Sequence, residues 1–379
     1  MCSTRFLCRT TASTDFTVLA RSIFGRRTPI ATAKANMSTT STSSKPIHEL
    51  GTADGWHGVI APDSPFPPEA GRYHLYIGLF CPFAHRANLV RHLLGLTSFI
   101  DISIVEPYPK GDEKGWPGWR FPKSDDEYPG ATRDKLFGSE YLHEVYFRAD
   151  KEYKGRYSVP LLWDKKGDTI VNNESAELLR WLPTAFNSIL PSPQTELDLY
   201  PASLRTEIDA LTTWLQRDLN TGVYKAGFAQ TQSGYDAGVI PVFGALNRLE
   251  EIVAQNGGPY ILGKALTELD LRVYATLIRF DTVYVQHFKC NLGTIRHDYP
   301  VLNNWLKNLY WNVKGFKEST NFKHIKENYT KSHHDINPHA ITPMGPYPDV
   351  EGGVETDFSK VRVGGVKMPA VLEYQKTLE

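Results

Sequence analysis

The chain has 379 residues, 41% of them hydrophobic, which is enough to form two packed domains of ordinary size. Its formal net charge is zero, but the charge is unevenly distributed. Residues 1–45 carry seven basic side chains and one acidic one, a net charge of +6, so the rest of the chain has a net charge of −6. A mildly acidic body without a basic patch argues against a nucleic acid as partner. No apolar run reaches the roughly 20 residues that span a bilayer.

Four cysteines are present, and no two of them form a CxxC pair: Cys2, Cys8, Cys81 and Cys290. Two belong to the N-terminal segment, which leaves only two for the folded body. The pattern is neither a disulfide framework nor a zinc ribbon, and it fits a reducing compartment.

Residues 1–45 are rich in Arg, Ser, Thr and Ala and nearly free of acids. This composition is typical of an organellar transit peptide, and we expect mitochondrial import or import into another organelle. A tail without a targeting role is the alternative. Met37 could serve as a second start and give a cytosolic form. Residues 46–70 are rich in Pro and Gly, and we expect them to be extended.

The stretch from Arg72 to Gly95 predicts a strand followed by a helix. Its first half is aromatic and β-branched, and its second half has apolar residues at helical spacing before Gly95, a residue suited to end a helix. Pro82 suits the first helical position. Cys81 therefore lies at a helix N-terminus, where backbone N–H groups and the helix dipole lower a thiol pKa and favour a nucleophile. The alternative is a buried structural cysteine.

A second strand is predicted over residues 99–105. Residues 106–150 then have weak periodicity, and a loop that long is usually functional or disordered. Its aromatic residues favour an ordered contact surface: Trp116, Trp119 and Phe121.

Two further strands are predicted at 157–163 and 169–171, joined by a turn. Asn173 is expected to cap a helix over 174–182 that Pro183 ends. The order strand, helix, strand, loop, strand, strand, helix predicts an α/β thioredoxin-like domain over 46–190.

From residue 203 the pattern is helical and contains no strands, which predicts an all-α domain over 203–330. Thr267 and Asp270 form a capping box before one apolar helix, and Pro300 suits the first turn of another. Residues 331–379 are rich in Pro and Gly, and we expect this tail to wrap the surface or fray.

The order of these parts resembles a glutathione transferase, and several motifs resemble the Xi class, the glutathionyl-hydroquinone reductases. The motifs run in order from about 50 to 348: Cys81-Pro-Phe-Ala-His-Arg86, Gly118-Trp119-Arg-Phe121, Ser158-Val159-Pro160-Leu-Leu-Trp-Asp164, Ile170-Val-Asn-Asn-Glu174-Ser175, Tyr224-Lys-Ala-Gly-Phe228, Arg279-Phe-Asp-Thr-Val-Tyr284-Val-Gln-His-Phe-Lys-Cys290 and Asn328-Tyr329-Thr-Lys-Ser-His333-His-Asp-Ile-Asn-Pro338. Phe83 stands where many members have Trp, which implies altered packing beside the sulfur. The resemblance also implies a homodimer.

The resemblance implies that Cys81 attacks the glutathione sulfur and forms a mixed disulfide, which makes the site deglutathionylating. It places Val159 before a cis Pro160, where the valine backbone pairs with the cysteinyl part of glutathione. Glu174 and Ser175 would hold the γ-glutamyl end, although ordinary helix capping gives the same pattern. The remaining implied contacts to glutathione are Trp119, Arg120 and Arg156. For His85 and Arg86, one turn after the cysteine, a packing or solvated role is the alternative, and we favour it for His85.

Three tyrosines far apart in the sequence fall in these motifs, and the resemblance places the aromatic substrate between the two domains. It implies that Tyr224 exchanges a proton with the leaving hydroquinone, and that Tyr284 and Tyr329 donate hydrogen bonds that favour the Cys81 thiolate. Buried core tyrosines are the alternative for each one taken alone.

His287 and the His333-His334 pair could suggest a metal site, but no third ligand accompanies them at metal-ligand spacing. We therefore expect no metal. The resemblance implies glutathione as the co-substrate. The nearest rival function is an omega-like thioltransferase or dehydroascorbate reductase, which shares the Cys-Pro-Phe start. A non-catalytic interaction module, or a membrane-inserting relative with the same junction, is a rival of another class.

Overall fold

The computed structural model describes residues 55–109, 111, 115, 118–191, 196–346, 350 and 352–379. The predicted transit peptide, Met37 and Trp116 lie outside the described residues. The domain boundaries given above stay predictions.

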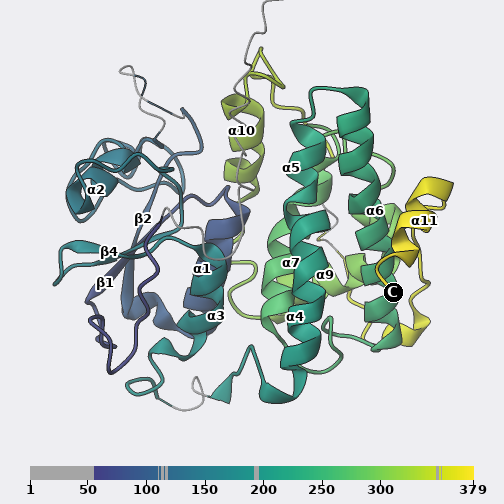
Figure 1. Cartoon of the computed structure of the whole chain (residues 1–379), viewed down its shortest axis with the longest axis horizontal. Helices are drawn as coiled ribbons and strands as arrows, with labels where there is room; N and C mark the ends of the chain where they lie inside the picture. Colours follow the sequence, from purple (N-terminus) through teal and green to yellow (C-terminus); the bar gives the residue numbers. More distant parts are fainter. Residues whose placement is uncertain are drawn as a thin grey trace, which may run out of the picture. The chain divides into compact units, whose positions relative to one another are not determined.

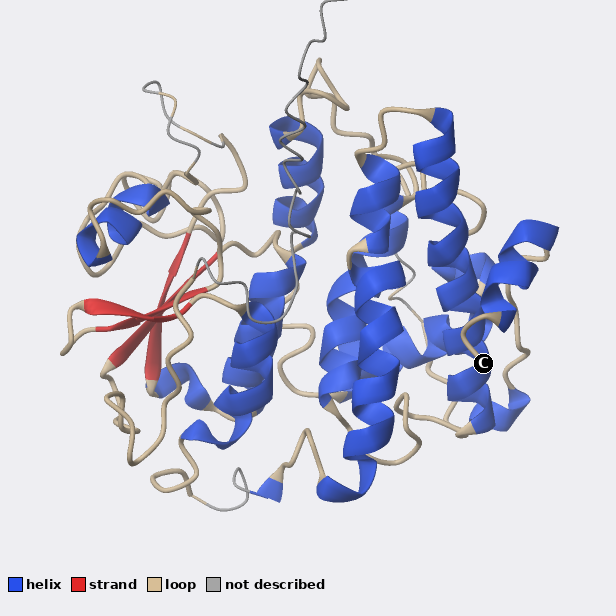
Figure 2. Ribbon diagram, viewed as in Figure 1, coloured by secondary structure: helices blue, strands red, loops and turns tan. Residues whose placement is uncertain are grey.

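A four-stranded mixed sheet forms the centre of the first part of the chain (Figure 2). Its strands are β1 (Tyr73–Ile77), β2 (Ile100–Ile104), β3 (Leu161–Asp164) and β4 (Thr169–Asn172), in the order β2-β1-β3-β4. β1 runs parallel to β2 and antiparallel to β3, and β3 runs antiparallel to β4. The central strand β1 is buried along its whole length, which explains its continuous apolar and aromatic sequence.

Three α-helices accompany this sheet: α1 (Pro82–Leu93), α2 (Leu142–Ala149) and α3 (Ser175–Ala185). α1 and α3 pack side by side between the sheet and the helical part of the chain, and α2 lies on the other side of the sheet (Figure 1). Pro82 occupies the first turn of α1, and Gly95 adopts a left-handed conformation with φ 66° just after its end, both as predicted. The arrangement confirms the thioredoxin-like layer.

Helices alone make up the regular structure of the second part, as predicted, among the residues that the structure describes. They are α4 (Arg205–Trp214), α5 (Gly222–Gly227), α6 (Gln232–Gln255), α7 (Glu268–Arg279), α8 (Ile295–Asp298), α9 (Pro300–Asn312), α10 (Phe322–Ser332) and α11 (Pro369–Lys376). Two π-helical turns, Leu215–Asn220 and Phe280–Tyr284, follow α4 and α7 directly. Such turns often lie at functional sites. No described helix is both long and apolar enough to span a membrane.

The capping box at the start of α7 is present as predicted. The buried Asp270 carboxylate accepts the backbone N–H of Thr267 at 2.9 Å and that of Ile261 at 2.9 Å. It also accepts the indole N–H of Trp305 on α9, at 2.9 Å. One carboxylate therefore fixes the start of α7 and binds α9 to it.

Two predicted features of the first part differ from the structure. The segment 106–150 was expected to be a loop throughout, but α2 forms at its end because Leu142, Val145 and Tyr146 are buried on one helix face. α3 is capped by Glu174, not by Asn173, whose amide oxygen instead accepts the N–H of Trp56 at 2.9 Å.

The predicted end of α3 was also wrong, and the C-terminal tail contains a helix that was not predicted. α3 continues through Pro183 to Ala185, because both residues are buried against the core and a proline two residues from a helix end removes only one backbone hydrogen bond. The tail wraps the surface, one of the two expected outcomes, but it does so with an unpredicted helix, α11, that packs on α6. There Asn247 donates to the side chain of Gln375 at 3.1 Å and to the carbonyl of Val366 at 2.9 Å.

A buried histidine on β1 makes the stability of the fold depend on pH. His74 is 2% exposed, its Nε2 lies 2.8 Å from Ser103 Oγ, and burial lowers its pKa to about 4. The unfolded chain therefore binds more protons between pH 6.5 and 4, and stability is lost as the pH falls through this window. At pH 5 the titration of His74 lowers the free energy of unfolding by about 2 kcal/mol.

We predict that His74→Gln loses less of its free energy of unfolding between pH 7 and pH 5 than the native chain, by about 2 kcal/mol. Urea unfolding followed by tryptophan fluorescence at the two pH values measures this. Ser103→Ala is the matched control, because it removes the hydroxyl partner and keeps the titrating ring. An equal loss in His74→Gln and the native chain would contradict the prediction.

Candidate functional site

A cavity of about 360 Å³ collects most of the predicted site residues. Its walls come from both parts of the chain and include Cys81, Pro82, Phe83, Trp119, Arg156, Val159, Pro160, Asn173, Glu174, Ser175, Tyr224, Asn328, Tyr329 and His333. Nine of the eleven residues singled out from the sequence are among them. Tyr284 and Arg120 are not.

Cys81 is the N-cap of α1, as predicted from the proline that follows it. Its Sγ accepts the backbone N–H of Ala84 at 3.5 Å, and its S–H donates to the carbonyl of Val159, also at 3.5 Å. The side chain is only half-buried and lines the cavity. The sulfur is therefore accessible to a ligand there.

The prediction of a lowered thiol pKa is wrong. Burial raises the pKa of Cys81 above its ordinary value, although the amides of Ala84 and Phe83 and the charges of Arg279 and Arg86 oppose the change. Loss of water around the sulfur outweighs long N–H contacts. The two amides and the two arginines favour the thiolate, but burial outweighs them and favours the thiol.

The backbone before β3 presents Val159 and Pro160 to the cavity beside the sulfur. The bond between them is cis, as predicted. Because the Val159 carbonyl already lies within reach of Cys81, a ligand that pairs with this backbone has its own atoms beside the thiol.

The N-terminus of α3 offers groups for both ends of an amino-acid ligand. The Glu174 carboxylate accepts the N–H of Ala176 at 3.1 Å and the hydroxyl of Ser175 at 3.4 Å. The helix dipole and the Ser175 hydroxyl suit a carboxylate, and the Glu174 carboxylate suits an ammonium group. The capping role that was the alternative is therefore also real, and the two roles share the same side chains.

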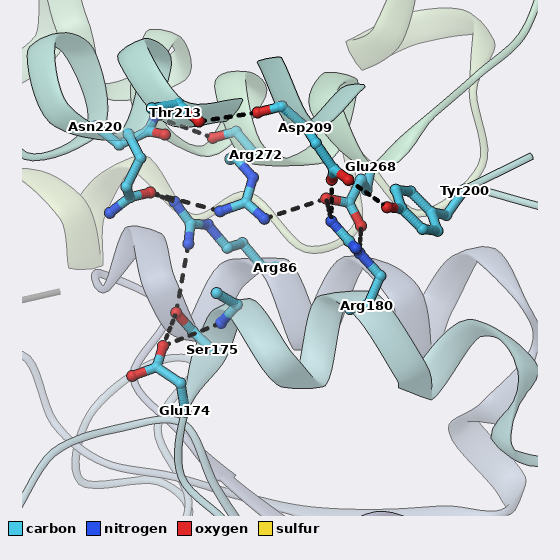
Figure 3. A network of polar contacts seen from close by, with 12 residues as sticks. Arg86, Glu174, Ser175, Arg180, Tyr200, Asp209, Thr213, Asn220, Glu268 and Arg272 are labelled. Carbon is cyan, nitrogen blue, oxygen red and sulfur yellow. Dashed lines mark hydrogen bonds and ion pairs between the residues drawn. The ribbon is translucent and has the colours of Figure 1, made fainter. Parts of the chain in front are cut away.

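A network of charged groups lies beneath this helix end and crosses to the helical part (Figure 3). Arg86, 2% exposed, donates to Ser175 Oγ at 3.4 Å and to Gln216 in the π-helical turn after α4 at 3.2 Å. Arg272 on α7 reaches the same Gln216 oxygen at 3.5 Å. A ligand carboxylate at Ser175 would thus lie over two buried guanidinium groups, whose charge favours it.

The network continues to a carboxylate held by two arginines, that of Glu268, and from there to Asp209 and Tyr200 (Figure 3). Glu268 accepts Arg272 at 3.3 Å and both Arg180 Nε at 2.6 Å and Arg180 Nη2 at 3.0 Å. Arg180 is on α3 and Glu268 on α7, so this ion pair also joins the two parts of the chain. Within this network, Arg86 holds the Ser175 hydroxyl in position at the cavity.

The three predicted tyrosines meet through their hydroxyls, from three separate elements. The hydroxyl of Tyr329 on α10 lies 2.6 Å from that of Tyr224 on α5 and 3.0 Å from that of Tyr284. Burial raises the pKa of all three, so they are neutral donors. Tyr224 and Tyr329 line the cavity, whereas Tyr284 is fully buried behind them.

Phe83 lines the same cavity as the sulfur and lies near Tyr224. It is 6% exposed, its ring centroid is 6.2 Å from that of Tyr224, and the Arg86 guanidinium carbon is 4.9 Å from its ring centroid. An aromatic side chain here contacts both a buried cation and a site tyrosine.

The remaining predicted contacts differ in their positions. Trp119 lines the cavity and packs on Phe80, with ring centroids 4.6 Å apart, and Arg156 is exposed at the rim. Arg120 is held elsewhere, by Glu106 and Glu127 at 2.7 Å each. The structure therefore does not bring Arg120 to the cavity.

Sequence reasoning did not assign eleven of the twenty lining residues to the site, and these include Asn173, Asn328 and His333, whose polar side chains stood in the quoted motifs. Asn173 was read only as a helix cap, and Asn328 and His333 stood in a quoted motif without a role. His333 Nδ1 lies 3.0 Å from His287 Nε2, and no group of three metal-ligating side chains occurs among the described residues. The position of His333 beside Tyr329 in the motif was the available signal.

Two family models match the chain. The model of the glutathione S-transferase N-terminal domain matches residues 80–185, and that of the C-terminal domain matches residues 232–308. The first spans Cys81, the cis-proline segment and the start of α3. The second spans α6, α7 and most of α9.

Three relatives cover most of the chain. The "omega-like 2" glutathione S-transferase of Schizosaccharomyces pombe is 51% identical over 76% of this chain and 89% of its own. The glutathionyl-hydroquinone reductase YqjG of Escherichia coli is 45% identical over 79% of this chain and 87% of its own. Its glutathione-bound structure matches with a TM-score of 0.73 and 42% identity, over 80% of this chain and 98% of that one. The glutathione S-transferase Xi of Phanerochaete chrysosporium matches with a TM-score of 0.74 and 46% identity, over 80% and 99%.

Proposed function

The chain belongs to the glutathione S-transferase family, and we propose that it is a Xi-class enzyme that reduces S-glutathionyl-hydroquinones to free hydroquinones. The observation that carries the proposal is one cavity that holds the Cys81 thiol together with the hydroxyls of Tyr224 and Tyr329. A relative 45% identical is named as such a reductase, and a structure of it holds glutathione.

Glutathione is the co-substrate, and the cavity has groups for its γ-glutamyl and cysteinyl parts. The γ-glutamyl carboxylate lies at the N-terminus of α3, on Ser175 above Arg86, and its ammonium on Glu174. The cysteinyl backbone pairs with Val159, which places the glutathione sulfur against Cys81. Trp119 and Arg156 flank the ligand from the wall and the rim.

In the first step the Cys81 sulfur, as thiolate, attacks the sulfur of the glutathionyl-hydroquinone. A sulfur–sulfur bond forms, the bond between sulfur and ring carbon breaks, and its electron pair goes to the ring carbon. That carbon takes a proton from Tyr224, which Tyr329 supports at 2.6 Å. The proton that Cys81 loses on forming the thiolate restores the Tyr224 hydroxyl, so Cys81 loses one proton, the carbon gains one and the step balances.

In the second step a further glutathione thiolate attacks the glutathionyl sulfur of the mixed disulfide. The Cys81 thiolate leaves with the electron pair of the broken bond, and oxidised glutathione departs. The two steps together consume one glutathione and one glutathionyl-hydroquinone.

An omega-like thioltransferase or dehydroascorbate reductase uses the same cysteine chemistry, and the S. pombe relative carries the name "omega-like 2". Only the reductase of aromatic thioethers needs a proton donor for a ring carbon. The linked hydroxyls of Tyr224 and Tyr329 in the cavity wall therefore favour the quinol substrate.

Two further proposals rest on resemblance and composition. The enzyme forms a homodimer, as the resemblance implies. Light scattering of the purified chain tests this, and the mass of a monomer would refute it. Residues 1–45 direct it to mitochondria, as their basic, acid-poor composition supports. Cell fractionation with and without these residues tests this, and an unchanged distribution would refute it.

We predict that Cys81→Ala abolishes release of free hydroquinone from glutathionyl-menadiol, because no other described side chain in the cavity can form the mixed disulfide. Chromatographic detection of menadiol measures it, with dehydroascorbate assayed in parallel. Cys290→Ala is the control, since Cys290 is buried outside the cavity. Undiminished turnover by Cys81→Ala, or faster turnover of dehydroascorbate by the native chain, would refute the proposal.

Tyr224→Phe should lower kcat for glutathionyl-menadiol about 100-fold, because the ring carbon loses its proton donor. The KM for glutathione should stay within about twofold, since the γ-glutamyl and cysteinyl contacts remain. Steady-state kinetics at saturating glutathione measure both values. Tyr235→Phe is the matched control, because the Tyr235 hydroxyl donates to the carbonyl of Lys289 outside the cavity. Equal effects of the two substitutions would show that Tyr224 acts only through packing.

A further inference from the structure

Arg279, the last residue of α7, is a fully buried cation directly behind the turn that ends in Cys81. Its guanidinium donates to the carbonyls of Phe80 at 2.9 Å and Leu79 at 3.1 Å, the two residues before the cysteine. It also donates to the carbonyl of Ala275 at 2.6 Å, on its own helix. No carboxylate in the part of the chain that the structure describes forms an ion pair with it.

The fourth partner of Arg279 is His85, one turn after Cys81 on α1. Arg279 Nη1 lies 3.0 Å from His85 Nδ1, and because a guanidinium can only donate, Nδ1 is the acceptor. Nε2 therefore carries the proton and donates to Ser319 Oγ at 2.8 Å. His85 is neutral, and burial beside Arg279 holds its pKa well below the ordinary value. The packing role favoured for His85 is thus an orienting role toward Arg279.

A buried cation held only by neutral groups carries a large desolvation cost, which a nearby anion offsets. Among the described residues, the ionisable groups whose charge acts most strongly on Cys81, or on which Cys81 acts, include Arg279, Arg86, Tyr224 and Tyr284. Tyr224 and Tyr284 are neutral, and Arg86 faces Glu174 and the Ser175 hydroxyl, where the glutathione carboxylate binds. Of these groups, the Cys81 thiolate that forms during the reaction is the anion that Arg279 can balance.

We propose that Arg279 is a positioning residue that supplies the counter-charge of the Cys81 thiolate, held in place through His85 and the carbonyls of Leu79 and Phe80. This inference rests on the proposed function. It assigns a role to the one charged residue of its motif that faces the cysteine and that the two-step mechanism leaves unused.

The role matters most when the mixed disulfide is resolved. Glutathione thiolate attacks the glutathionyl sulfur, the bond to Cys81 Sγ breaks, and its electron pair stays on Sγ beside Arg279. A stabilised leaving thiolate leaves faster and shifts the exchange equilibrium toward reduced Cys81. Each factor of ten in thiolate stabilisation corresponds to one unit of thiol pKa.

The test compares Arg279→Met and Arg279→Lys with the native chain. Iodoacetamide alkylation of Cys81 at pH 8, followed by mass spectrometry of the Cys81 peptide, reports the thiolate fraction without any quinol. We expect a rate about tenfold lower in Arg279→Met and a partial loss in Arg279→Lys. Arg91→Met is the matched control, because Arg91 is also buried and held by carbonyls, of Ile100 and Thr97, and its rate should not change.

A second measurement places each variant in mixtures of reduced and oxidised glutathione and determines the glutathionylated fraction of Cys81. The neutral variant should need about tenfold more reduced glutathione to clear the mixed disulfide, and Arg279→Lys less. If Arg279→Met does not fold, Arg279→Gln takes its place with the same expectation. A folded neutral variant with native alkylation and native exchange would overturn the inference. Because neither assay contains a quinol, their outcome is independent of whether the enzyme reduces glutathionyl-hydroquinones.

Discussion

The turn from Leu79 to Cys81 is held from two sides, by its own helix α1 and by Arg279 from the helical part of the chain. The first contact presents the sulfur to the amides at the start of α1, and the second locks the carbonyls behind it. Because Arg279 sits at the end of α7, and the π-helical turn with Tyr284 follows at once, the same helix end fixes the cysteine and the tyrosine network. Loosening this one clamp would disturb the nucleophile and the proton donors together.

The electrostatics of the site are a balance between burial and fixed charge. Burial raises the pKa of Cys81 and of the three tyrosines, which keeps the hydroxyls protonated and able to donate. Arg279 and Arg86 lower the thiol pKa from positions where neither is exposed. Cys81 therefore reacts through a small thiolate fraction that the two arginines increase, a setting that suits exchange with the sulfur of a bound substrate. The two arginines also divide the work, since Arg86 lies under the ligand carboxylate and Arg279 behind the sulfur.

Most of the architecture could be predicted from local sequence signals. The strand, Cys81-Pro82 and Gly95 gave β1 and α1, the Thr267–Asp270 box gave α7, and the motif with Val159 and Pro160 gave the cis bond. Errors arose where tertiary contacts decide. The Asn173 side chain accepts a hydrogen bond from the Trp56 backbone, so Glu174 caps α3 instead. α11 is stabilised by its contacts with α6, and no local sequence pattern indicates these contacts. The thiol pKa was predicted with the wrong sign because a sequence shows the helix N-terminus but not the loss of water around the sulfur. Arg120 was drawn to acidic partners that its motif does not contain.

The central claim is that Cys81 takes the glutathionyl group from the substrate before any second glutathione acts. A single-turnover reaction of the enzyme with glutathionyl-menadiol, quenched in acid without added glutathione, tests it by mass spectrometry of the Cys81 peptide. We expect one glutathionyl group on Cys81 for each menadiol released, and its removal when glutathione is added. Release of menadiol with Cys81 unmodified would contradict it.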